Sequence, residues 1–99
     1  MPILVREVFS IDPESMKEAK EKMREFRGMA KKLNHPMPKV MTDLVSTHYT
    51  LVMETEFPDM ATFEKSISSA FDTPEWKQWY PEFRALMTGG HREIFSIVD

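Results

Sequence analysis

The chain has 99 residues, with 13 Lys and Arg against 16 Asp and Glu, a net charge of −3 and no cysteine. This length predicts one domain, residues 1–99, able to bury about 65% of its surface. The small negative charge argues against nucleic acid as a partner, and the lack of cysteine excludes disulfides, thiolate metal sites and a cysteine nucleophile. Without a basic N-terminal flank or a long apolar run, we expect a cytoplasmic protein with no membrane partner.

The first third of the chain predicts a strand followed by a helix. Residues 3–10 are rich in β-branched and aromatic side chains, which are typical of a strand. Asp12 and Pro13 match a helix start, with Asp as the cap and Pro in the first turn. Apolar side chains then recur every three or four residues, which predicts an amphipathic helix of about twenty residues ending near Asn34. These residues are Met16, Ala19, Met23, Phe26, Ala30 and Leu33.

The middle of the chain predicts two strands. Pro36 and Pro38 oppose a helix and favour an extended entry into a strand over residues 40–45. Residues 48–57 alternate between two faces, which predicts the next strand. One of these faces carries His48, Thr50, Val52, Glu54 and Glu56. The short connection favours a hairpin, although no Asn-Gly or Asp-Gly pair marks its turn.

The last part predicts two helical segments and a final strand. Asp59 is placed to cap a helix that runs from Met60 to about Phe71. A second cap-and-proline signal predicts a helical segment over residues 74–87, which Pro81 is expected to kink or break. Gly89 and Gly90 are expected to form a flexible stop before a strand over residues 91–98. The predicted order is therefore βαββαβ.

This order predicts an α+β fold with a ferredoxin-like, antiparallel four-stranded sheet. Two helices cover only one face of such a sheet, so the other face must meet solvent or a partner. Several strands carry apolar residues on both faces, as Leu4 and Val8 oppose Val5 and Phe9. We therefore expect two sheets to pack face to face in a two-fold homodimer, with residues of mixed polarity between them.

The strand order, the paired helical segments with Phe63 and Trp76 to Tyr80, and the closing GGHREIFSIV are similar to one known superfamily. Along essentially its whole length the chain resembles the dimeric α+β barrels, especially NIPSNAP-like and antibiotic-biosynthesis-monooxygenase-like domains. The resemblance implies a homodimer whose sheets form a barrel, in some members around a small organic ligand. Members include cofactor-independent oxygenases and haem-degrading enzymes. We expect no cofactor.

Histidine is the first side chain to consider for acid–base chemistry, because its ordinary pKa lies near neutrality. His48 and His91 begin predicted strands and are candidate catalytic bases, although histidines at a sheet edge commonly face solvent. His35 follows the first helix, where a cation favours the helix dipole, and is given a structural role. No pair of histidines has metal-ligand spacing, so no metal site is expected.

Charged residues inside strands are the second group of candidates, because a covered strand excludes charge unless it is paired or used. Arg6 and Glu7 point to opposite faces, so only one of them can enter an inter-sheet space. If Glu54 or Glu93 lies in that space, desolvation would raise its pKa and suit it as a general base. The alternative is a salt bridge across the dimer. Arg92 could likewise pair with a carboxylate or clamp an anionic ligand.

Aromatic residues cluster in the second helical region and suit either a ligand-stacking wall or simple core packing. They are Phe71, Trp76, Trp79, Tyr80 and Phe83. Together with the strand residues they complete the set of candidate pocket residues. That set is Arg6, Thr50, Trp76, Trp79, Tyr80 and Glu93.

Three functions remain open from the sequence. The first is binding of a small, largely apolar organic molecule, either between sheet and helices or between two sheets. The second is a cofactor-independent monooxygenase in which His48, His91 or Glu54 deprotonates the substrate before oxygen reacts. The third is a structural or regulatory dimerisation module that binds no small molecule.

Overall fold

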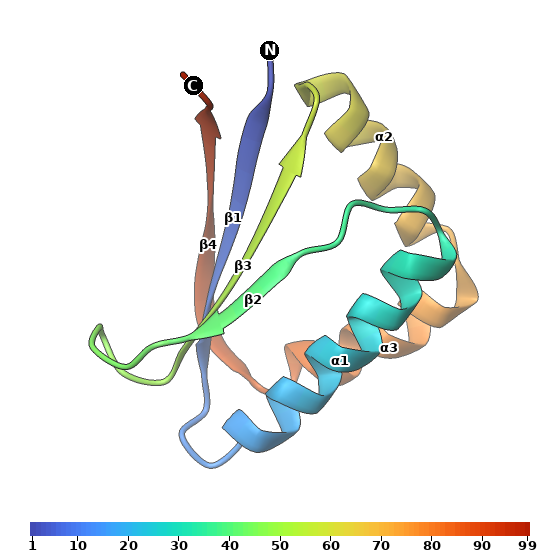
Figure 1. Ribbon diagram of the computed structural model, residues 1–99. Helices are drawn as coiled ribbons and strands as arrows, with labels where there is room; N and C mark the ends of the chain where they lie inside the picture. Colours follow the sequence, from blue (N-terminus) through green and yellow to red (C-terminus); the bar gives the residue numbers. More distant parts are fainter.

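Four antiparallel strands form one sheet, and three helices cover one of its faces (Figure 1). The computed structural model describes all residues, 1–99. The elements are β1 (Ile3–Ile11), α1 (Met16–Lys32), β2 (Lys39–Thr42), β3 (Thr50–Phe57), α2 (Met60–Phe71), α3 (Pro74–Arg84) and β4 (Met87–Ser96). The strand order β2-β3-β1-β4 confirms the predicted α+β, ferredoxin-like fold. None of the helices is long and apolar enough to cross a membrane.

The register of β1 against its two neighbours sorts the side chains onto two faces. Glu7 lies opposite Met53 of β3 and Arg92 of β4, and this row faces the helices. The next row, with Arg6 between Glu54 and Glu93, points to the other face because side chains alternate along a strand. We call this second side the outer face. Arg6 and Glu7 therefore lie on opposite faces, as predicted.

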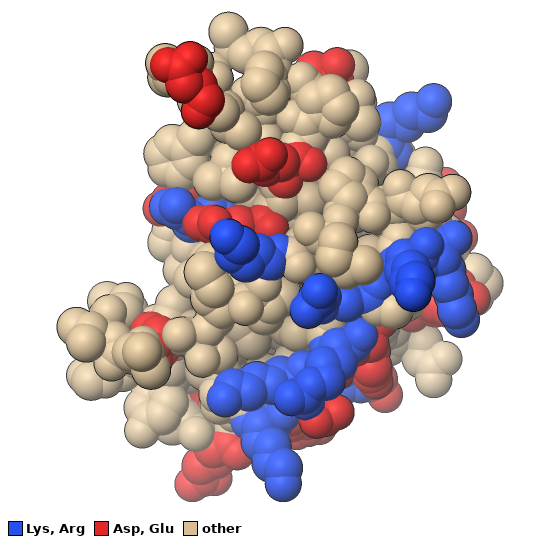
Figure 2. All heavy atoms as spheres, viewed as in Figure 1, with Lys and Arg blue, Asp and Glu red and all other residues tan.

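The core lies between the sheet and the helices. Ile11, Leu51 and Phe83 have exposed fractions of 2% or less. α3 is fixed on α1 by a hydrogen bond of 2.8 Å from Trp79 Nε1 to the carbonyl oxygen of Lys22. The ammonium of Lys22 also lies 2.7 Å from the Glu82 carboxylate, and the contact raises the pKa of Lys22. The opposite side of α1 carries charged side chains of both signs and faces solvent (Figure 2).

Two of the three helices begin directly after the capping residue that the sequence predicts. Asp59 accepts a hydrogen bond of 2.7 Å from the Thr62 backbone N–H, so α2 begins where predicted. Thr73 caps α3, with Pro74 in its first turn. The prediction for α1 is wrong by one turn. Asp12 accepts from the backbone N–H of Glu14 in a short turn, and the helix begins only at Met16.

The hairpin strands β2 and β3 pair as predicted but are shorter than expected. β2 ends at Thr42 and β3 begins at Thr50, so residues 43–49 form the connection. His48 and Tyr49 both have positive φ, at 70° and 53°, which is incompatible with a continuing strand. The Asp43 carboxylate accepts from the Thr50 backbone N–H at 2.9 Å and closes this loop. Local hydrogen bonding therefore replaces the first predicted ladder pairs.

Two expectations about the last third of the chain are wrong. The break predicted at Pro81 is absent: α3 continues to Arg84 because buried Trp79 and Phe83 hold the turns on both sides of the proline, while the alternative of a kink stays a prediction. The helix ends before residue 87, and β4 takes up Gly89 and Gly90, which pair with Ser10 and Phe9. These glycines are not a flexible stop, because hydrogen bonding to β1 fixes them in the sheet.

Gly90 permits a close approach of β4 to β1 that any side chain would obstruct. A Cβ atom at this position would lie 2.7 Å from the backbone oxygen of Val8, whereas one at Gly89 would meet nothing within 4 Å. We expect Gly90→Ala to lower the free energy of unfolding by about 1–3 kcal/mol, because backbone must move. Urea unfolding measures this loss, with Gly89→Ala as the matched control. Equal stability of the two variants would contradict the steric account.

Candidate functional site

A cavity of about 520 Å³ lies between the sheet and the helix layer. Hydrophobic residues make up 17 of the 22 that line it, so the cavity favours an apolar occupant. β1, β3 and β4 form one wall, and α1, α2 and α3 form the other. The cavity belongs to one chain and lies on the opposite side of the sheet from the outer face.

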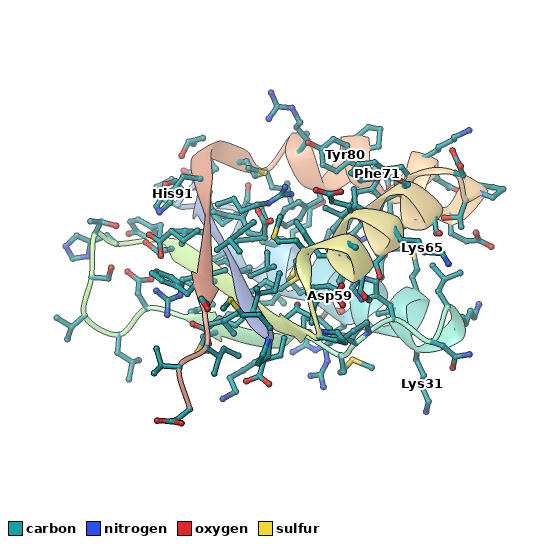
Figure 3. The ribbon with its side chains drawn as sticks, turned by 90° about the horizontal axis from the view of Figure 1, so that it is seen from above. Lys31, Asp59, Lys65, Phe71, Tyr80 and His91 are labelled. Carbon is teal, nitrogen blue, oxygen red and sulfur yellow. The ribbon has the colours of Figure 1, made fainter.

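Stacked aromatic rings form the helical wall of this cavity. Trp76 and Tyr80 stack with centroids 5.4 Å apart and an interplanar angle of 16°, and Phe71 lies 5.0 Å from Trp76. Trp79 and Phe83 stack 5.0 Å apart at 8°. Figure 3 shows Phe71 and Tyr80 near each other on the helix layer. The structure therefore brings together three of the predicted pocket residues: Trp76, Trp79 and Tyr80.

A few polar side chains interrupt the apolar lining. Glu7 and Arg92 form an ion pair across β1 and β4. Thr55 of β3, with an exposed fraction of 6%, also lines the cavity. The sequence predicted only one feature of this polar set, the pairing of Arg92 with a carboxylate. Glu7 was considered only for a space between two sheets, and Thr55 was not considered as a site residue, although strand alternation places both on the same face as Val5 and Phe9.

His35 is the histidine that lines the cavity. Its ring packs edge-on against Phe57, with centroids 5.5 Å apart, and against Phe26. Its Nδ1 lies 2.9 Å from the backbone oxygen of Pro36, so Nδ1 carries the donated proton, and in the neutral ring Nε2 is the acceptor. The structural role predicted for His35 missed this position. The sequence carries little indication of this position, because only the folded turn over residues 34–38 directs the His35 ring toward α1 and β3.

The predicted strand candidates lie on the outer face and not in the cavity. Arg6 Nε donates to Glu54 at 2.7 Å, and Arg6 Nη1 donates to Glu93 at 3.1 Å. His91 Nε2 lies 2.9 Å from the other carboxylate oxygen of Glu93. Figure 3 shows His91 on the side of β4 away from the helices. These contacts form a salt-bridge network within one chain, and the predicted salt bridge across a dimer stays a prediction.

Hydrogen bonds within this outer-face network set the charge state of Glu93 in the single chain, whereas the predicted rise of its pKa applies to a space between two sheets and stays a prediction. Its pKa lies below the ordinary value, because the hydrogen bond from His91 and the contact with Arg6 favour the charged carboxylate. Arg6 in turn has a raised pKa from its bonds to Glu54 and Glu93. The network therefore holds its charges in place, and Glu93 is a weaker base than an ordinary carboxylate.

This pairing predicts a pH dependence of stability. A lowered folded-state pKa means that Glu93 stabilises the fold above its ordinary value of 4.5 and that this contribution is lost as pH falls through the lower folded value. We expect His91→Gln to move the pKa of Glu93 upward, toward 4.5, because it removes the largest cause. Carboxyl ¹³C NMR titration measures the shift. His48→Gln, in the loop, should leave Glu93 unchanged, and an unchanged pKa in both variants would contradict the assignment.

The remaining predicted site residues lie at the start of β3. His48 is exposed in the loop before the strand and does not begin it. Thr50 has an exposed fraction of 4%, and its hydroxyl donates to the His48 carbonyl oxygen at 3.3 Å. Both residues therefore shape the loop and lie outside the cavity. No group of three His, Asp or Glu side chains is placed to hold a metal ion.

Of the comparisons with known proteins, only the one with solved structures finds proteins similar to this chain. No protein-family model and no curated protein sequence matches the chain. The fold is that of NIPSNAP and antibiotic biosynthesis monooxygenase-like proteins, which confirms the resemblance inferred from the sequence.

Three solved structures illustrate the likeness. A NIPSNAP family protein from Agrobacterium tumefaciens is 14% identical, with a TM-score of 0.87 over 100% of this chain and 95% of that chain. A NIPSNAP domain protein from Burkholderia xenovorans is 12% identical, with a TM-score of 0.82 over 99% and 95%. An antibiotic biosynthesis monooxygenase is 18% identical, with a TM-score of 0.74 over the whole of both chains.

Proposed function

We propose that this protein binds a small, largely apolar organic molecule in the cavity between its sheet and its helices. One observation carries the proposal, a cavity of about 520 Å³ with a predominantly hydrophobic lining. A volume of this size matches small-molecule sites, which combine apolar walls with a few polar groups. The stacked rings of Trp76 and Tyr80 offer a planar ligand one aromatic surface.

The two tryptophans make the proposal directly testable. Both Trp76 and Trp79 line the cavity and are the only tryptophans of the chain, so their fluorescence reports on its contents. We expect naphthalene derivatives to change this fluorescence and to raise the unfolding temperature. A ligand at a hundred times its Kd adds about 2.7 kcal/mol of stability when it binds only the folded state. Neither signal with any probe would favour the third function, a structural module without a ligand.

Oxygenation without a cofactor is a second candidate function, and the position of His35 favours it. With Nδ1 donating to Pro36, Nε2 of the neutral ring is suited to remove a proton from an activated methylene group in the cavity. The resulting carbanion can react with O₂, so that CH₂ becomes C=O while the second oxygen leaves as water. One of the similar structures is itself an antibiotic biosynthesis monooxygenase.

Oxygen uptake with anthrone, an aromatic ketone with such a methylene group, tests this second function. His35→Gln is expected to abolish the uptake, whereas His48→Gln, His91→Gln and Glu54→Gln change groups that lie outside the cavity. Loss of uptake in one of those three variants, with His35→Gln active, would instead support the base predicted from the sequence. No uptake by the native protein would leave ligand binding as the function.

We propose further that two copies pair through their outer faces. This face carries Leu4, Val8 and Val52, together with Met41 and Phe95, whose exposed fractions are 36% and 46%. A face with this many apolar side chains favours cover by a partner. Pairing through this face would place Arg6, Glu54, His91 and Glu93 in the interface. Sedimentation equilibrium is expected to give the mass of two chains, and a monomer at micromolar concentration would contradict pairing.

A further inference from the structure

The ion pair between Glu7 and Arg92 gives the cavity a specific polar element. These are the two charged residues among those that line it. They lie directly opposite each other on β1 and β4, and both side chains face the helices. Glu7 is largely buried, with 16% of its side chain exposed, whereas Arg92 is 47% exposed. The pair therefore lies where the apolar interior meets the mouth of the cavity.

The pair leaves hydrogen-bonding groups of both kinds unused. Arg92 Nε donates to one carboxylate oxygen of Glu7, while the guanidinium lies over the Phe63 ring, 5.3 Å from its centroid. The terminal nitrogens of Arg92 and the second oxygen of Glu7 make no hydrogen bond within the chain. A fixed guanidinium donor and a fixed carboxylate acceptor thus lie side by side.

Thr55 adds a third polar side chain to the same wall. The residue has an exposed fraction of 6% and lines the cavity. It lies opposite Val5 on β3, one row along the helix-facing side of the sheet from Glu7. No buried side-chain polar atom of the chain lacks a hydrogen-bond partner, so Thr55 adds a neutral polar group to this wall and the ion pair supplies the unused groups.

The charge of the pair decides which kind of polar group fits. Glu7 and Arg92 together are neutral, so a bound anion or cation would bring an unbalanced charge into a mainly apolar cavity. A neutral group with a donor beside an acceptor would satisfy both unused partners. Primary carboxamides and enols or phenols next to a carbonyl have this arrangement.

We infer that the cavity selects a neutral, ring-containing molecule that donates a hydrogen bond to Glu7 and accepts one from Arg92. The rings lie against Trp76 and Tyr80, and the polar end lies at the ion pair. This inference rests on the proposed function and specifies the class of its ligand. It excludes carboxylates as preferred ligands. Arg92 would favour a carboxylate only if Glu7 were absent.

Three naphthalene probes of nearly equal size test the inference by tryptophan fluorescence. 2-Naphthamide is neutral with a donor and an acceptor, 2-acetylnaphthalene has the acceptor alone, and 2-naphthoate is an anion. We expect 2-naphthamide to bind about tenfold more tightly than either of the others, because hydrogen bonds to charged groups contribute that much. A preference for 2-naphthoate would overturn the inference.

Glu7→Gln tests the role of the charge with almost no change of shape. It leaves the guanidinium of Arg92 uncompensated, so the ratio of 2-naphthoate to 2-naphthamide affinity should rise about tenfold or more. Glu56→Gln is the matched control, because Glu56 is an exposed β3 residue outside the cavity. A purely structural ion pair would lower stability in Glu7→Gln and leave the ratio unchanged.

The outcomes separate this inference from the function on which it rests. If all three probes bind equally and Glu7→Gln does not alter their ratio, the cavity binds apolar molecules and the polar selection is wrong. If none of them binds the native protein, both the proposed function and the inference are wrong.

Discussion

Replacing Ala70 with phenylalanine is expected to weaken ligand binding at least about a hundredfold, equivalent to about 2.7 kcal/mol. Ala70 lies near the end of α2, is half-buried and lines the cavity. A benzyl side chain there would occupy the space that a planar ligand needs against Trp76. Titration of 2-naphthamide against the tryptophan fluorescence of each protein measures the loss.

The same substitution on the other side of α2 provides the control. Ala61 is exposed and outside the cavity, so Ala61→Phe should bind 2-naphthamide as the native chain does. Ala70→Phe should also remain folded, because the new ring fills empty volume and contacts apolar neighbours. Undiminished binding by a folded Ala70→Phe protein would show that the ligand lies elsewhere, for example between two sheets.

Phe83→Ala is expected to cause the largest loss of stability of any single change considered, about 3–5 kcal/mol. The Phe83 side chain is 1% exposed, stacks on Trp79 and meets Phe9 edge-on at 5.0 Å. It therefore joins α3 to β1, and its removal would leave a hole next to the existing cavity. Urea unfolding at a fixed protein concentration measures the change.

Phe71→Ala is the appropriate comparison for that loss. Phe71 also packs on a tryptophan and lines the cavity, but 45% of its surface is exposed. Replacing Phe71 removes less buried surface, so Phe71→Ala should lower the free energy of unfolding clearly less than Phe83→Ala does. Equal losses for the two variants would show that α3 does not depend on Phe83 for its attachment to the sheet.

The regular elements could be predicted because their signals are local. The apolar spacing of α1 follows the helical repeat, and Asp59 and Thr73 cap the helices they precede. The errors arose where long-range packing outweighs local preference. Pro81 does not end α3, because burial of Trp79 and Phe83 holds the helix, and Gly89 and Gly90 pair with β1.

The candidate site was only half predictable for the same reason. The aromatic residues of α3 could be predicted to form a wall, since their clustering is visible along the chain. Glu7 and Arg92 are 85 residues apart and become neighbours only through the register of β1 and β4. His35 reaches the cavity because the turn after α1 directs its ring toward Phe57. No spacing in the sequence encodes either contact.

The sequence by itself determined the order of elements, the ferredoxin-like class and the alternation that separates Arg6 from Glu7, because hydrophobic period and capping act over a few residues. Only the tertiary structure decided which face encloses a cavity. Strand alternation divides residues into two sets but does not say which set the helices cover. The packing of the helices settles that choice, and it places the Glu7 row against the helices and the Arg6 row on the outer face.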